Sequence, residues 1–264
     1  MTRHLTFDAL HNFRDLGGYR TADGQSVRWH RLYRSDSLGK LSSPADLERF
    51  RELDIGTVID LRHPWEIAAK GRIPQIDGVA HHNLSIEHRP YDQAEIDPDV
   101  DPWRHLADRF AEVAEDGVAE IRQVLGLIAT ADRPVVFHCA SGKDRTGLIA
   151  ALVLTLLGAS EDDIAADFAL TELATPQLVA DWRTANPGRT LRWPGYGRAP
   201  EDVIRHVLAD LTAAHGSVRA YATGTLGVDE ELIGSLRARL LTNWSPNEGN
   251  RPGLTGPTIP LNRI

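Results

Sequence analysis

The sequence is poor in cysteine and in long hydrophobic runs. Its 264 residues include one cysteine, Cys139, so no disulfide can form within the chain and this residue serves either packing or chemistry. No segment reaches the roughly 18 uninterrupted apolar residues of a membrane-spanning helix, and the longest apolar region, residues 148–157, suits a buried core helix. The first residues also lack the apolar segment of a signal peptide. We therefore expect a cytoplasmic protein.

Positive charge is scarce as well. The 29 lysine and arginine residues are outnumbered by 37 aspartate and glutamate residues, which gives a net charge of −8. A sequence-independent grip on nucleic acid needs a basic face, and so does docking on anionic lipid. We therefore expect no nucleic-acid partner and no stable membrane association. A local basic pocket is still compatible with this overall charge.

What the sequence does contain is an alternation of short apolar runs and helical segments. Residues 57–61 and 134–138 are apolar runs of strand length, typical of buried parallel strands. Asp23-Gly24 predicts a hairpin turn. Helices are expected over residues 44–53, 103–130 with a break near Gly117, 145–157, 161–172, 176–185, 200–215, 217–223 and 229–241.

Strands that alternate with helices indicate an α/β fold with a mostly parallel central sheet flanked by helices. With 42% hydrophobic residues, the chain is long enough to bury the core of one sizeable domain. We expect a single domain over residues 1–242. Residues 243–264 are rich in proline, glycine and asparagine without periodicity, and they predict a loosely held tail.

The most informative segment is HCASGKDRTG, residues 138–147, between a predicted strand and an apolar helix. The amides of residues 140–145 can converge on an anion, and the start of the helix adds its positive dipole end. Gly142 permits a backbone conformation that a side chain would block, and the planar guanidinium of Arg145 can bind two phosphate oxygens at once. The same positive field favours the thiolate form of Cys139. The segment predicts a phosphate site that contains its own nucleophile.

Other interpretations of this segment explain less of it. An inert core cysteine would account for none of the flanking features. An ATP-binding P-loop would need a serine or threonine after Gly142-Lys143, where Asp144 stands, and a glycine five residues before Gly142. A phosphate-binding pseudoenzyme would be expected to lack the cysteine or the arginine. A rhodanese-like sulfurtransferase would lack Arg145-Thr146.

The segment resembles the signature loop of the protein-tyrosine phosphatase superfamily. Its Gly-Lys-Asp-Arg-Thr version is similar to the bacterial tyrosine phosphatase B type, which is related to atypical dual-specificity phosphatases. The resemblance covers residues 11–241, but the chain departs from the family pattern over residues 85–103 and after residue 241. Four further segments carry it: Asn12-Phe13-Arg14-Asp15-Leu16-Gly17-Gly18-Tyr19, Leu32-Tyr33-Arg34-Ser35, Asp60-Leu61-Arg62 and Ala166-Asp167-Phe168.

This resemblance implies a phosphatase-type fold with a helical lid, C-terminal helices and no metal or other cofactor. It implies that Cys139 is the nucleophile and that Arg145 binds the phosphate. The lid is expected to be the helix that begins near Trp103. The walls of the pocket are expected to come from aromatic side chains, for which the candidates are Trp65, Trp103, Trp193 and Tyr196.

Two aspartates compete for the role of general acid, which protonates the leaving oxygen. Asp144 lies in the loop itself, the position that relatives in the family use. Asp60 follows a predicted strand, at the sheet edge where the sites of parallel sheets gather. The supporting candidates have expected roles as follows: His138 orients the loop through a backbone contact, Thr146 donates to the sulfur, Lys143 adds charge beside the phosphate, and Ala140, Ser141, Gly142 and Arg62 help to bind it.

The predicted reaction is hydrolysis of a phosphate monoester in two steps. The thiolate attacks phosphorus while the guanidinium and the loop amides hold the charge of the transferring group, and water then cleaves the phosphocysteine. The leading expected substrate is phosphotyrosine in a protein. The alternative is a soluble small phosphomonoester, such as a sugar or nucleotide phosphate.

Overall fold

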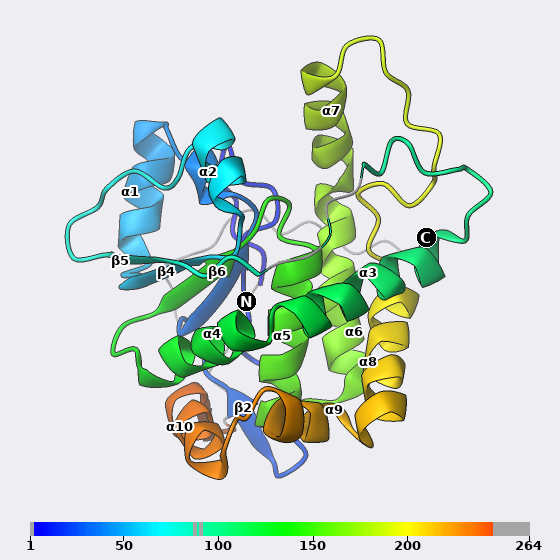
Figure 1. Ribbon diagram of the computed structural model, residues 1–264. Helices are drawn as coiled ribbons and strands as arrows, with labels where there is room; N and C mark the ends of the chain where they lie inside the picture. Colours follow the sequence, from blue (N-terminus) through cyan, green and yellow to red (C-terminus); the bar gives the residue numbers. More distant parts are fainter. Residues whose placement is uncertain (1–2, 87–88, 90–91, 245–264) are drawn as a thin grey trace.

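The computed structural model describes residues 3–86, 89 and 92–244. A five-stranded sheet forms its centre, in the order β1-β3-β6-β4-β5 (Figure 1). The four strands β3, β6, β4 and β5 are parallel, and only the edge strand β1 is antiparallel. The predicted mostly parallel sheet is confirmed. Its strands are β1 (Arg14–Asp15), β3 (Leu32–Ser35), β4 (Thr57–Asp60), β5 (Ala80–Asn83) and β6 (Val135–His138).

Helices cover both faces of this sheet. Their bounds are η1 (Leu38–Lys40), α1 (Pro44–Glu52), α2 (Pro64–Lys70), α3 (Pro102–Asp116), α4 (Val118–Thr130), α5 (Asp144–Leu157), α6 (Glu161–Ala169), η2 (Leu170–Ala174), α7 (Thr175–Ala185), α8 (Glu201–His215), α9 (Val218–Ala220), η3 (Tyr221–Thr225) and α10 (Glu230–Leu240). Among the residues that the structure describes, no helix combines the length and the apolar character needed to cross a membrane.

Side chains alternate between the two faces along the strands. In β4, Val58 joins a smaller apolar cluster with residues of α1 and the N-terminal segment, whereas Ile59 faces the larger cluster built mainly by the helices on the other side. In β6, Val136 likewise belongs to the smaller cluster and Phe137 to the larger one. This period of two is what a strand buried on both faces requires. Helix α5 lies in the larger cluster and is buried on nearly all sides, as its apolar sequence predicts.

The predicted hairpin at Asp23-Gly24 is present. Its second strand also pairs with a strand that the sequence did not predict. Strand β2 (Gln25–Val27) pairs antiparallel with β7 (Leu241–Asn243), so the last described residues return to the hairpin. Asn243, assigned to the tail from its composition, pairs with Gln25, and the paired region therefore reaches one residue into the predicted tail. The rest of that tail, from residue 245, lies outside the described residues.

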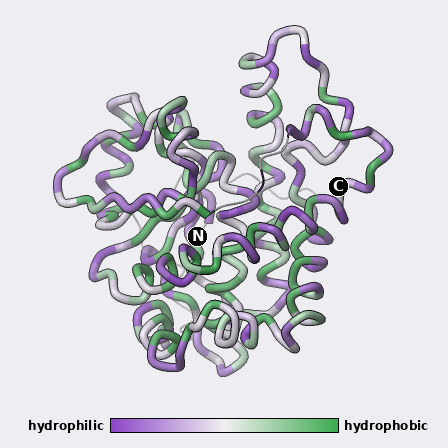
Figure 2. The backbone as a smooth tube through the Cα atoms, viewed as in Figure 1, coloured by the Kyte–Doolittle hydropathy of each residue, from purple (hydrophilic) through white to green (hydrophobic). Residues whose placement is uncertain are grey.

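The expected lid helix has a different role in the structure. Helix α3, which contains Trp103, buries five residues and packs along α8, so it belongs to the core. Helix α7 is the one that projects from the body (Figure 1), and none of its residues is buried. The loop after α7 is mostly hydrophilic or intermediate in Figure 2, while hydrophobic residues concentrate along the helices below the sheet.

Two further elements differ from the sequence prediction. The predicted helix over residues 217–223 is a single turn, α9, followed by the π-helical turn η3, in which the amide of Leu226 donates to the carbonyl of Tyr221. Strand β5 has the sequence Ala-His-His-Asn, without an apolar pattern, and was not predicted. It pairs with β4 along its whole length at the edge of the sheet.

Candidate active site

The predicted phosphate loop connects the end of β6 to the start of α5. It emerges at the carboxyl edge of the parallel strands, beside the last residues of β3 and β4, because Ser35 and Asp60 both lie level with His138 in the sheet. Ligand sites of parallel sheets gather at this edge. The loop is thus held between two neighbouring strands on one side and the first turn of a buried helix on the other.

Every carbonyl of residues 139–143 accepts a hydrogen bond from a donor outside the loop. Because a carbonyl only accepts, Nδ1 of His138 carries the proton in its contact, and this is the backbone contact expected for that histidine. The five bonds are His138 Nδ1 to Cys139 O at 3.1 Å, Ser37 N to Ala140 O at 3.0 Å, Asn12 Nδ2 to Ser141 O at 2.9 Å, Arg34 Nη2 to Gly142 O at 2.8 Å and Gly147 N to Lys143 O at 2.7 Å.

With the carbonyls turned outward, the amides of residues 140–145 face the other side of the loop. Among the described residues, no group accepts a hydrogen bond from these amides. Together with the N-terminus of α5 they form a concave, electropositive surface of the kind that suits an anion. Gly142 has φ +69°, and a Cβ there would lie 2.5 Å from the carbonyl oxygen of Ser35, so the loop needs glycine at this position, as predicted.

Cys139 and Arg145 lie at opposite ends of this loop. Cys139 is 2% exposed. The guanidinium of Arg145 forms a two-point ion pair with Glu66 of α2, at 2.7 and 2.9 Å, and also donates to the carbonyl of Leu61 at 3.3 Å. Burial opposes the charge on Arg145, but the hydrogen bond with Glu66 and the charge of a Cys139 thiolate raise the pKa of this guanidinium overall.

The pKa of Glu66 shifts in the opposite direction, downward. Burial alone would raise the pKa of this carboxyl, but the hydrogen bond and the charge of Arg145 lower it overall. The amide of His63 also donates to Glu66, at 2.9 Å, as part of a capping box at the start of α2. Glu66 therefore stays ionised and links helix α2 to the arginine of the loop.

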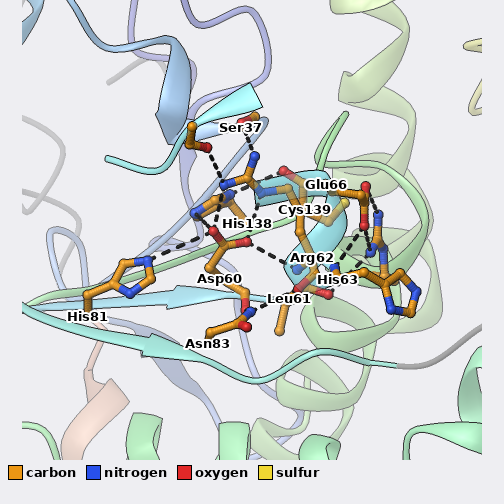
Figure 3. A network of polar contacts seen from close by, with 12 residues as sticks. Ser37, Asp60, Leu61, Arg62, His63, Glu66, His81, Asn83, His138 and Cys139 are labelled. Atoms are coloured by element: carbon orange, nitrogen blue, oxygen red, sulfur yellow. Dashed lines mark hydrogen bonds and ion pairs between the residues drawn. The ribbon is translucent and has the colours of Figure 1, made fainter. Parts of the chain in front are cut away.

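Asp60 and Arg62 form a second buried pair, below the loop (Figure 3). Two guanidinium nitrogens of Arg62 donate to Asp60 at 2.9 and 2.7 Å, and the remaining donors reach Ser37 Oγ and the carbonyl of Gly71. Asp60 is fully buried, and burial favours its neutral form. The hydrogen bonds from Arg62, together with the nearby imidazole of His81 at 3.9 Å, nevertheless lower the pKa of Asp60 well below the usual range. Asp60 and Arg62 are therefore bound to each other and to neighbouring residues, and neither side chain lies at the surface of the loop.

His138 is buried beside this pair, with Nε2 3.6 Å from Oδ2 of Asp60. Burial lowers its pKa to about 4, against the raising effect of the Asp60 charge. The imidazole is neutral at physiological pH, which suits a structural role in the sheet. In Figure 3, Cys139 lies between the Asp60–Arg62 pair and Glu66.

Asp144 differs from Asp60 in exposure. It is the first residue of α5, its side chain is 24% exposed, and its Oδ1 lies 3.4 Å from Nζ of the nearly buried Lys143. The Asp144 carboxyl is therefore partly accessible to solvent. Thr146 is fully buried, and its hydroxyl forms no hydrogen bond with another described residue, so the expected bond to the sulfur is not seen.

The four expected pocket walls lie in different environments. Trp65 of α2 is 61% exposed and stacks on His63, next to the Glu66–Arg145 pair. Trp193 is buried, and its indole N–H donates to the carbonyl of Val100, so the prediction of this tryptophan as a wall is wrong. Trp103 and Tyr196 are partly buried.

Sequence reasoning missed the residues that hold the loop from outside. These are Asn12, Arg34, Ser37 and Glu66. Asn12 and Arg34 belong to segments that carry the family resemblance, but no role followed from it. For Glu66 the signal was local, a glutamate three residues after the N-cap of a helix that begins with proline. Over the described ranges, no three His, Cys, Asp or Glu side chains group as metal ligands.

The chain is similar to known phosphatases. Among solved structures, TpbA of P. aeruginosa is 19% identical, with a TM-score of 0.36 over 83% of this chain and 94% of that chain. The triple specificity protein phosphatase PtpB of Mycobacterium tuberculosis is 34% identical over 199 residues, 64% of this chain and 69% of that protein. A protein of Cupriavidus necator, named provisionally as a tyrosine-protein phosphatase, is 34% identical over 89% of this chain and 85% of its own length. A model of the tyrosine phosphatase family matches residues 5–242, and the chain therefore belongs to the tyrosine phosphatase family.

Proposed function

We propose that this phosphatase hydrolyses phosphotyrosine in proteins through a phosphocysteine on Cys139, with Arg145 as the phosphate-binding side chain and Asp144 as the general acid. One observation carries the proposal: all five loop carbonyls are bound from outside, which leaves the amides and the cysteine on the same concave side. Such a surface stabilises the charge of a transferring phosphoryl group without reorganisation. We further propose that residues 1–242 form one catalytic domain.

In the first step, the sulfur of Cys139 attacks phosphorus and forms the S–P bond while the P–O bond to the leaving group breaks. The loop amides and Arg145 bind the three equatorial oxygens in the transition state. Asp144 donates its proton to the leaving oxygen. In the second step the Asp144 carboxylate accepts a proton from water, the water oxygen attacks phosphorus, and the S–P bond breaks to give inorganic phosphate and the free thiolate.

Asp144 suits the role of general acid better than Asp60 because of exposure and charge. Asp144 stands at the loop and is partly exposed, so it can exchange protons with water. Asp60 is sealed from solvent, and its two oxygens are bound by Arg62. A carboxyl whose pKa is held so low is ionised at neutral pH and has no proton to give.

The preference for an aryl phosphate is supported by Trp65, the most exposed large apolar side chain among the described residues, which stands next to the residue that holds Arg145. An exposed indole beside Glu66 in the sequence offers a face on which the ring of a phosphotyrosine can stack. The names of the relatives include tyrosine-protein phosphatases. A nucleophilic thiolate also needs a reducing compartment, so we propose that the enzyme works in the cytoplasm.

The test is release of inorganic phosphate, with a metal chelator present, from p-nitrophenyl phosphate, a phosphotyrosine peptide, a phosphoserine peptide, phosphoinositides, sugar phosphates and nucleotides. We expect aryl phosphates to have the highest kcat/KM and lipids the lowest. Cys139→Ser should have no turnover and still bind vanadate, since the amides and Arg145 remain. An active Cys139→Ser variant would contradict the mechanism. A soluble metabolite preferred over phosphotyrosine by a hundredfold, about 2.7 kcal/mol, would assign the enzyme to the small-molecule class.

A further inference from the structure

Three charged side chains lie fully buried behind the phosphate loop: Arg14 of β1, Arg34 of β3 and Asp167 of α6. Asp167 Oδ1 accepts from Arg14 Nε at 3.1 Å, and Oδ2 accepts from Arg34 Nη1 at 2.6 Å. Tyr19 also donates its hydroxyl to Asp167 Oδ1, at 3.3 Å. These four residues come from the N-terminal third of the chain and from α6, and they meet beneath residues 141–142.

The charges of this group do not balance. Across the described ranges, Asp167 is the one carboxylate within ion-pair distance of Arg14 or Arg34, so two buried cations share one anion. Asp15, although buried beside Arg14 in sequence, is bound instead by the amides of Gly17 and His30. Taking an uncompensated charge out of water costs several kcal/mol, at an order of magnitude, so the surplus needs an anion nearby.

Each of the other charged groups around the loop has at least one partner of opposite charge. His138 of β6 is buried and neutral, with a pKa lowered to about 4 by burial. The pairs are Asp60 of β4 with Arg62, Glu66 of α2 with Arg145 of α5, Lys143 with Asp144 of α5, and Asp36 after β3 with Lys40 of η1, which Asp181 of α7 also contacts from the exposed side. The surplus of positive charge therefore lies with Arg14 and Arg34.

Arg34 is the member of the group that touches the loop. Its Nη2 donates to the carbonyl of Gly142 at 2.8 Å, and its Nε is buried without a hydrogen-bond partner among the described residues. Burial and the charge of Arg14 lower the pKa of Arg34 to about 10, while Asp167 and the charge of a Cys139 thiolate act in the raising direction. In the sheet Arg34 lies level with Phe137, and its side chain contacts Gly142, so it spans the segment that contains Cys139.

We propose that Arg34 is a positioning residue for this phosphatase: it turns the Gly142 carbonyl away from the pocket and places uncompensated positive charge behind the Cys139 thiolate and the bound phosphate. The anion that balances Arg14 and Arg34 is then the thiolate itself, or the phosphoryl group after attack. This inference rests on the proposed function, in which Cys139 is the nucleophile. It adds a source of charge that is separate from Arg145, because Glu66 already neutralises Arg145.

The test uses the pH dependence of Cys139 alkylation by iodoacetamide, which follows the thiolate fraction and needs no turnover. Arg34→Met removes the surplus cation, so the alkylation profile should move to higher pH. A profile that moves up by one pH unit makes alkylation about tenfold slower on its acidic side. Asp167→Asn removes the shared anion and should move the profile to lower pH. Shifts of the two alkylation profiles in opposite directions would show an effect of charge, because general damage to the loop would shift both profiles in the same direction.

Two further variants complete the experiment. Arg34→Lys keeps the charge but loses the two-point geometry, so its alkylation profile should stay near that of the wild type while vanadate affinity falls about tenfold or more. Tyr19→Phe, which removes only a neutral hydrogen bond to Asp167, should match the wild type in both measurements. If Arg34→Met or Asp167→Asn does not fold, the remaining variant is compared with Arg34→Lys.

The inference is overturned if a folded Arg34→Met keeps the wild-type alkylation profile, if Asp167→Asn moves the profile to higher pH, or if Arg34→Lys moves it as far as Arg34→Met. Failure of the proposed function would look different. In that case Cys139→Ser would retain turnover, whatever the alkylation profiles of the Arg34 variants showed.

Discussion

Glu66 holds both terminal nitrogens of Arg145: Nη1 lies 2.7 Å from Oε2, and Nη2 lies 2.9 Å from Oε1. The two residues are 79 positions apart in the sequence. Glu66 is itself fixed by the amide of His63 at the start of α2. The orientation of the Arg145 guanidinium is therefore fixed by helix α2, which lies far from the loop in the sequence.

The first prediction concerns a variant without the carboxylate that holds Arg145. In Glu66→Gln, the amide oxygen can accept from one nitrogen of Arg145, but the amide NH₂ would face the other donor. We expect kcat/KM for p-nitrophenyl phosphate to fall about tenfold to hundredfold, because a misplaced guanidinium no longer matches the transferring oxygens. Glu48→Gln, on an exposed position of α1, is the matched control and should leave kcat/KM unchanged. An unaltered Glu66→Gln enzyme would show that Arg145 is oriented by other contacts.

The second prediction compares two glycines. Gly142→Ala would place a Cβ 2.5 Å from the carbonyl oxygen of Ser35 at φ +69°, so the loop must shift. We expect a loss of about 1–3 kcal/mol in the free energy of unfolding, together with loss of vanadate binding. Gly126→Ala lies in the interior of α4, with nothing within 4 Å of its added Cβ, and should gain about 0.5–1 kcal/mol. Urea unfolding curves of both variants give the comparison, and equal stabilities would contradict it.

These cases show what the sequence could and could not predict. The strands β4 and β6 were predicted to within one residue, because compact apolar runs buried on both faces have a local signature. Strand β5 was missed since its position is fixed by pairing with β4, not by its own polar residues. The loop could be predicted for a similar reason, because Cys139, Gly142 and Arg145 all lie within one short segment of the sequence.

The residues that orient the loop could not be predicted in the same way. Asn12, Arg34 and Ser37 reach its carbonyls from positions more than 100 residues away. The pairing of β1 with β3 and of β3 with β6 brings them there. Arg62 illustrates the converse. It was expected to bind substrate, but its guanidinium donors go to Asp60, Ser37 and Gly71, a pairing that depends on burial and not on sequence spacing.

The third prediction concerns Asp15, a buried carboxyl outside the active site. Burial raises its pKa to about 7, although the amides of His30 and Gly17 donate to it and oppose this effect. The folded protein therefore binds this proton more tightly than the unfolded chain, where the carboxyl has its ordinary, lower pKa. The resulting stabilisation is complete below that lower value and is lost as the pH rises through about 7, with only a small remainder lost above that pH.

The measurement is the free energy of unfolding in urea at pH 5, 6, 7 and 8 for the wild type and Asp15→Asn. The difference, wild type minus variant, should decrease by an amount on the order of 2 kcal/mol between pH 5 and pH 7 and then level off. Titrating groups that do not contact Asp15, including His138, are common to both proteins and cancel in the difference. His30, whose Nδ1 lies 3.3 Å from Oδ2 of Asp15, does not cancel, so both proteins also carry His30→Asn. A difference that is constant with pH would mean that Asp15 is ionised throughout this range.

The fourth prediction separates the two aspartates by the leaving group of the substrate. Asp144→Asn should lower kcat about 10²–10⁴-fold for phosphotyrosine, whose phenolate leaves poorly without a proton. The loss should be much smaller for p-nitrophenyl phosphate, whose leaving group needs little protonation. Asp60→Asn leaves Arg62 buried without its carboxylate, so we expect a loss of about 3–5 kcal/mol in stability. Any loss of rate in that variant should be the same for both substrates.

The ratio of the two kcat values therefore assigns the proton donor without reference to absolute activity. A damaged loop lowers both rates together, whereas a missing acid lowers mainly the rate that requires a proton. The pH profile adds a second check, since the limb that reports the protonated acid should disappear only in Asp144→Asn. If the leaving-group dependence appears instead in Asp60→Asn, Asp60 must acquire a proton in the enzyme–substrate complex. The Asp60–Arg62 pair would then have to open during turnover, because Arg62 binds both carboxylate oxygens of Asp60.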